Sequence, residues 1–226
     1  MRPHIGKRVE KVEFSLTLRR IVVLGTPLLL TILLFFHPSP YDDVAGELMP
    51  IAGWWLALHT IGFLLFALMG VALWLLTAGL PGVFATVGRV AAVVFAVFYD
   101  AGDAIAGIST GILARSAEAG ALGERAAVLA IETLWADPFK TLLFDIGRDA
   151  FIVALVTAAV ALYRAGAPRL PLVLLALPAF FVTFDHAFPF GSLTFGTFFV
   201  IACWLELTPG RASSSRRIID EAKSEV

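Results

Sequence analysis

The sequence predicts an all-α integral membrane protein, a bundle of about six transmembrane helices, and three observations favour this fold. Of the 226 residues, 59% are hydrophobic and only 15% are charged, whereas soluble domains have about 45–50% and about 25%. Apolar runs long enough to cross a bilayer recur about six times. The connections between these runs are too short for a separate soluble domain. We therefore expect one transmembrane domain over residues 1–210, followed by a polar cytoplasmic tail over residues 211–226.

The first expected span covers residues 14–36. Basic residues precede its apolar run, as in a secretory signal, but no small-residue cleavage site follows. The run ends instead at His37-Pro38-Ser39-Pro40. We therefore expect this span to stay in the protein, with Arg19 and Arg20 reaching back to the inner membrane surface.

Five further spans are expected at about 51–77, 89–113, 139–163, 170–188 and 191–207. Tryptophans at the two ends of the second span suit the two membrane interfaces. Turns rich in proline and glycine separate the second span from the third and the fifth from the sixth. Pro138 suits the first turn of the fourth span.

The segment between the third and fourth spans is too charged to cross the membrane. Within it, Val128, Ile131 and Trp135 recur at helical spacing. This pattern predicts a short helix that lies on the membrane surface as an interfacial helix. A helix packed on the bundle is the alternative.

The distribution of basic residues predicts the orientation. With the amino terminus inside, thirteen of the seventeen lysine and arginine residues lie in cytoplasmic segments, and cytoplasmic loops carry the excess of such residues. Both termini are therefore expected in the cytoplasm. Arginine outnumbers lysine, and asparagine and glutamine are absent, which fits a bacterial cytoplasmic (inner) membrane.

Strongly polar residues recur at one depth of the expected bundle. At ~1.5 Å per helical residue, each of them falls in the outer half of the bilayer, and His37 at the end of the first span could join them. In the third span, Asp100 and Asp103 share a face with Gly107 and Gly111, whose GxxxG spacing permits close helix contact. We therefore expect an inward-facing pocket lined by His59, Asp100, Asp103, Asp145, Arg148, Asp149, Asp185 and His186.

This pocket holds five aspartates and one arginine. Each charged residue at the centre of a span costs ~2.5–3.5 kcal/mol on insertion scales, so the group needs compensation. Protonation, a bound cation or entering water could supply it. Alternatively, Arg148 pairs within its own helix with Asp145 or Asp149 and only fixes the packing.

Three functions remain open from these residues. The first is proton- or cation-linked transport or small-molecule binding, because intramembrane carboxylates commonly mark ion pathways. The second is a metal-dependent enzyme acting on a lipid or amphiphile, with His59, Asp103 and His186 as candidate ligands. The third is an accessory or structural protein whose polar network only fixes helix packing. Whether the protein is an enzyme, and which cofactor it takes, stay open at this point.

The expected partners are limited. A net charge of −1 and one cysteine give no sign of nucleic-acid binding or of a cysteine metal cluster. Phosphate-binding glycine loops are absent, so no nucleotide is expected. The lipid bilayer is the expected surrounding, and a homodimer would supply the second half that six short spans lack for transport.

A stretch of the sequence resembles a known family. FAVFYDAGDAIAGISTGIL over residues 95–113, with WWLALH at 54–59 and GLPGVFATVGRV in the loop, looks like an uncharacterised family of bacterial multi-pass membrane proteins. The resemblance covers the second and third spans. It implies a membrane protein and carries no function over to these residues.

The topology can be tested with reporter fusions. Fusions at both termini and near Leu80 and Ala165 should report a cytoplasmic location, and fusions near Gly46 and Gly120 an external one. Labelling of a cysteine introduced at Gly120 from the cytoplasmic side alone would contradict this orientation.

Overall fold

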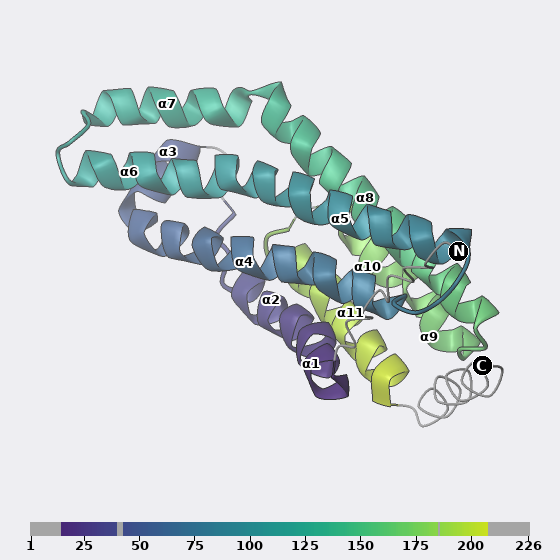
Figure 1. Cartoon of the computed structure of the whole chain (residues 1–226). Helices are drawn as coiled ribbons and strands as arrows, with labels where there is room; N and C mark the ends of the chain where they lie inside the picture. The colour runs from purple at the N-terminus through teal and green to yellow at the C-terminus, as the bar shows by residue number, and fades with distance from the viewer. Residues whose placement is uncertain (1–14, 40–42, 185, 208–226) are drawn as a thin grey trace, which may run out of the picture.

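The computed structural model describes residues 15–39, 43–184 and 186–207, and over these residues it is built of helices without a strand. Figure 1 shows long helices lying roughly side by side. Five helices are long and apolar enough to cross a membrane: Leu16–Phe35, Val44–Leu76, Val83–Glu118, Pro138–Arg164 and Phe190–Leu207. The expected all-α membrane bundle is thereby confirmed.

Local helix types divide the long helices into shorter elements. The first comprises α1 (Leu16–Arg20), the π-helical η1 (Ile21–Gly25) and α2 (Thr26–Phe35). The second comprises α3 (Val44–Leu48), the 3-10 helix η2 (Met49–Ile51) and α4 (Ala52–Leu76). The third comprises α5 (Val83–Asp103), the π-helical η3 (Ala104–Ser109) and α6 (Thr110–Glu118). The remaining elements are α7 (Glu124–Ala136), α8 (Pro138–Arg164), α9 (Arg169–Leu174), α10 (Ala176–Phe181) and α11 (Phe190–Leu207).

The expected fifth span differs from the structure. In place of one helix over 170–188 there are two short helices, α9 and α10, followed by turns. Pro178 lies in the first turn of α10 and has no backbone N–H to continue the hydrogen bonding of α9. Together the two helices cover only residues Arg169–Phe181, about 20 Å at helical rise, which is short of a ~30 Å hydrocarbon core.

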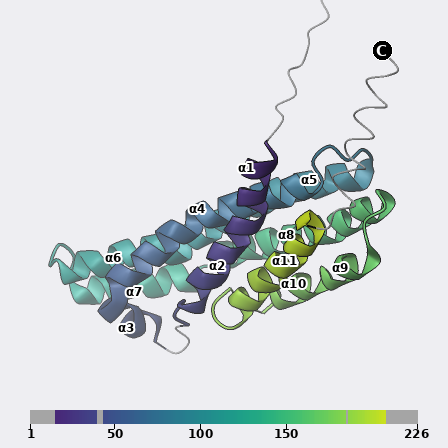
Figure 2. The same ribbon diagram turned by 90° about the horizontal axis from the view of Figure 1, so that it is seen from below.

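The third helix is longer than expected. Val83–Glu118 contains 36 residues, about 54 Å at helical rise, so it extends well beyond the core of a bilayer. The helix expected between the third and fourth spans is α7, and it lies along α6 in both views (Figures 1 and 2). Buried Ile131 and a hydrogen bond from Trp135 Nε1 to Thr110 Oγ1 of 3.0 Å join them. We call the end of the molecule formed by α3, α6 and α7 the α7 end.

Small residues allow close packing between α5 and α8. A Cβ atom at Gly147 would lie 2.7 Å from the backbone nitrogen of Tyr99, and one at Gly88 would lie 2.9 Å from Thr157 Oγ1. The rings of Phe95 and Phe151 fill the space between the helices, with centroids 5.1 Å apart. Close approach of this kind is the main source of helix association in membranes, where no hydrophobic drive exists between helices.

Replacing Gly147 with alanine should therefore destabilise the protein. The added methyl group would meet backbone atoms of α5, which cannot turn aside, and overpacking of this type costs about 1–3 kcal/mol. We expect a lower melting temperature in detergent for Gly147→Ala. The matched control is Gly53→Ala on α4, where nothing lies within 4 Å; equal melting temperatures for the two variants would contradict the α5–α8 packing.

Candidate metal centre

Three histidines meet near the α7 end of the bundle. His37 follows α2, His59 lies on α4, and His186 lies between α10 and α11. One ligand atom from each ring lies within 4.8 Å of the others. His37 and His59 are buried and His186 is partly buried. Histidines that are far apart in the sequence therefore form one cluster, which we call the histidine cluster.

Backbone carbonyls fix the protonation of two of these rings. His59 Nδ1 lies 2.9 Å from the carbonyl oxygen of Trp55, and His37 Nδ1 contacts that of Pro38. A carbonyl oxygen only accepts, so each Nδ1 must carry the proton and donate it. In the neutral rings the lone pairs are then on the two Nε2 atoms, which is the arrangement of metal-binding histidines with an oriented second nitrogen.

The two Nε2 atoms face each other at 3.3 Å. As lone-pair carriers they cannot form a hydrogen bond with one another, and a proton or a metal ion between them would turn this contact into a favourable one. Two imidazole ligands at about 2.0–2.1 Å from a tetrahedral zinc ion have nitrogens about 3.3 Å apart. The separation of this pair thus matches that of two zinc ligands, and His186 offers a third nitrogen within 4.8 Å of the other ligand atoms.

Two buried aspartates from α5 lie beside the cluster. Asp103 Oδ1 lies 3.8 Å from His59 Nε2. Among the residues that the structure describes, the buried oxygens Asp103 Oδ2 and Asp100 Oδ1 have no hydrogen-bond partner. A buried carboxylate without partners is costly, so a nearby positive charge would stabilise Asp103 in particular.

The local helix geometry at η3 supports the cluster. This π-helical segment begins directly after Asp103, and such segments are frequent at functional sites. The carbonyl of Gly107 in η3 accepts a hydrogen bond of 2.9 Å from Trp55 Nε1, and the indole in turn lies against the His59 ring with centroids 4.1 Å apart. A Cβ atom at Gly107 would overlap the His59 ring, so only glycine leaves room for this histidine.

The remaining residues of the expected pocket lie elsewhere or are undescribed. Arg148 pairs within α8 with Asp145, at 2.8 Å, and with Asp149, at 3.1 Å. These side chains are 33%, 46% and 66% exposed, so they form a separate group on the outside of the bundle. This is the intrahelical alternative considered from the sequence. Asp185 lies outside the described residues.

Sequence reasoning treated His37 as a possible neighbour of the pocket, whereas the structure makes it a central member. The sequence indicated this only through the position of His37 at the outer end of the first span, at the level of the other polar residues. That the His37 ring, after the end of α2, meets His59 on α4 could not be read from spacing alone.

Comparison of the chain with protein-family models, with curated proteins and with solved structures gives no match. The resemblance of the second and third spans therefore stays an observation on the sequence. The function must be argued from the site itself.

Replacing Asp100 with leucine should stabilise the protein. The change removes a buried carboxyl oxygen that has no described partner, and an unsatisfied buried polar group costs about 1–3 kcal/mol. We expect a higher melting temperature in detergent. The control is Asp137→Leu, which removes the cap on the Phe139 N–H at the start of α8 and should lower the melting temperature. A fall for Asp100→Leu as well would mean that this carboxyl group is satisfied.

Proposed function

We propose that this membrane protein is a metal-dependent enzyme that binds a zinc-like transition metal through His37, His59 and His186. The observation that carries the proposal is the pair of Nε2 atoms at 3.3 Å, each left with its lone pair because its Nδ1 donates to a carbonyl. Borderline metals such as zinc favour imidazole ligands of this kind.

Three histidines suit a catalytic metal better than a structural one. Structural zinc sites use four protein ligands, whereas catalytic sites keep one position for water. A metal held by these histidines would make such a water a nucleophile at neutral pH. Asp103, 3.8 Å from His59 Nε2, is placed to take the proton that the water gives up.

The corresponding reaction is hydrolysis. The water oxygen forms a bond to the carbonyl or phosphoryl centre of the substrate while its proton passes to Asp103. The bond to the leaving group then breaks, and the leaving group takes that proton. The metal keeps its oxidation state throughout, so no further reactant is needed.

The level of the site favours a lipid or another amphiphile as the substrate. His59 lies seventeen residues before Leu76, the last residue of α4, which is about 25 Å along the helix and most of a ~30 Å core. His59 is therefore near the membrane surface opposite to the Leu76 end of α4, and the headgroups and ester bonds of lipids lie at this level. In an inner membrane with both termini in the cytoplasm, the substrate would belong to the outer leaflet.

Proton- or cation-linked transport is the second candidate, and the aspartates favour it. Asp100 and Asp103 each bury an oxygen without a described partner, and a proton between His37 and His59 would satisfy their two Nε2 atoms equally well. In this case the cluster would carry a proton and hold no transition metal.

Metal analysis separates the two candidates. Protein purified without chelators should contain about one zinc, manganese or iron per chain. The metal should be lost in His59→Ala and in Gly107→Ala, which keeps every ligand but displaces the His59 ring. Thr60→Ala, on the exposed side of the same turn, and Gly53→Ala should keep the metal.

X-ray absorption at the metal edge should then show three imidazole nitrogens and at least one oxygen. Purified protein should release the polar leaving group from phospholipid or amide-linked lipid in micelles, and a chelator should abolish this release. If the purified protein contains no metal, and its melting temperature changes with pH but not with a chelator, the proposed enzyme function is wrong and transport is favoured.

A further inference from the structure

The charged group on α8 interrupts an otherwise apolar outer face. Asp149 is exposed and Asp145 and Arg148 are partly exposed, and exposed apolar side chains continue the same stripe on both sides: Leu142 towards the amino end and Val153 and Val156 towards the carboxyl end. The charges therefore interrupt an apolar stripe on the outer face of α8.

A lipid chain is a poor neighbour for this group. The intrahelical pairs with Arg148 leave one formal negative charge, and each aspartate keeps much of its surface exposed. Charged residues in transmembrane segments almost always face protein or water. Water at the membrane surface or the polar surface of another protein is thus the neighbour that the group requires.

The adjacent face of α5 has the pattern of a helix-pairing surface. Val83, Val87, Val90, Val94 and Val97 recur at spacings of four and three residues. All but Val94 are among the strongly exposed side chains. An exposed apolar repeat with alternating steps of four and three is the pattern of left-handed helix packing against a partner helix.

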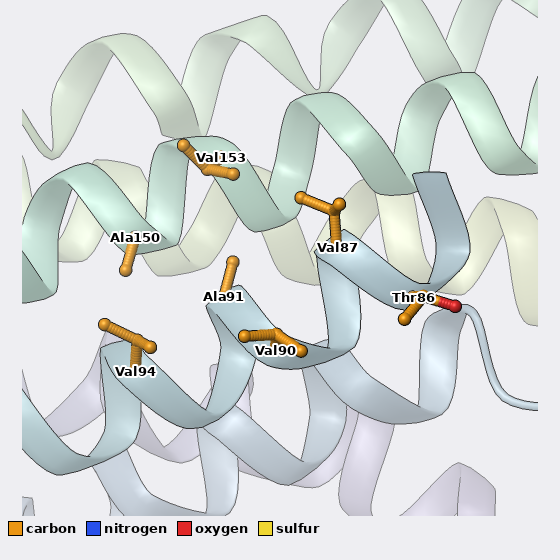
Figure 3. Close-up of a pocket in the computed structure, with 7 residues that line it drawn as sticks. All are labelled: Thr86, Val87, Val90, Ala91, Val94, Ala150 and Val153. Atoms are coloured by element: carbon orange, nitrogen blue, oxygen red, sulfur yellow. The ribbon is translucent and has the colours of Figure 1, made fainter. Parts of the chain in front are cut away.

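An apolar groove joins the two faces. Figure 3 shows it between α5 and α8, with valines from both helices at its walls. Val153 and Ala150 contribute from α8, and these positions follow Asp149 by one turn and by one residue. The groove and the charged group are therefore parts of one continuous surface, which we call the α5–α8 face.

We propose that a second copy of this chain covers the α5–α8 face. Two copies with the same orientation in a membrane are related by an axis along the membrane normal, which brings equal levels together. Arg148 of one copy then meets Asp145 or Asp149 of its partner, and the reverse. The mixed charges make the face complementary to itself, and the valine repeats pack in the same interface.

Cysteine cross-linking in native membranes tests this interface. In a Cys203→Ala background, Val90→Cys should form a disulfide-linked dimer on mild oxidation because the copies meet there. Leu64→Cys on α4, which is equally exposed but lies off the α5–α8 face, is the control and should stay monomeric. Equal cross-linking at both positions would overturn the proposal.

Exchange of charges between two variants tests the contact between Arg148 of one copy and the aspartates of the other. Because the result is read from a pair of variants, it does not depend on one variant alone. Arg148→Glu and Asp149→Lys should each weaken dimerisation about tenfold or more, since like charges would meet. Co-expression of the two variants with different tags should restore mixed dimers, because each supplies the charge that the other needs. Monomers by mass photometry in all samples, the parent included, would refute the interface. The metal content, which is set by the histidine cluster, should be unchanged throughout, so this failure is separate from failure of the proposed enzyme.

Discussion

The close approach of α4 to the long helix formed by α5, η3 and α6 is the constraint on which both the bundle and its site depend. Cβ atoms at Gly70, Gly107 and Gly111 would each collide with the partner helix. Because helices in a membrane gain little from excluding water, such contacts supply much of their association. The same contact buries His59 and Asp103 beside each other, next to the histidine cluster.

This constraint also explains why the site is assembled from side chains with second contacts. His59 donates to the carbonyl of Trp55, and Trp55 donates to the carbonyl of Gly107, so one chain of hydrogen bonds runs from α4 into η3 and fixes the ring. Ligands held by second contacts are oriented before a metal arrives. The π-helical turn at η3, which would be a defect in a purely structural helix, places the carbonyl where the indole needs it.

The fold was accessible from the sequence because apolar runs and their lengths determine which segments can span a membrane. The GxxxG pair at Gly107 and Gly111 likewise predicted close contact of its helix face. The expected fifth span, 170–188, was longer than the helices found there, because hydropathy does not show that Pro178 divides the segment into α9 and α10. From the sequence alone we expected the polar face of α8 to point into the bundle, because polar residues were expected to face inward. In fact small and apolar residues, Gly147, Phe151 and Ala154 among them, form the packed face.

Depth and rotation are therefore separate problems in a membrane sequence. Depth follows from counting residues, and it predicted that Asp103 on α5 and Asp149 on α8 both lie in the outer half of the bilayer. Rotation depends on which face packs most closely, and it sends Asp103 into the core and leaves Asp149 outside. Both positions are energetically unfavourable for a carboxylate without a polar neighbour. Residues that the sequence places in one half of the bilayer thus lie in two different surroundings, and the two proposals above, a bound metal for the buried aspartate and a second copy for the exposed one, address them separately.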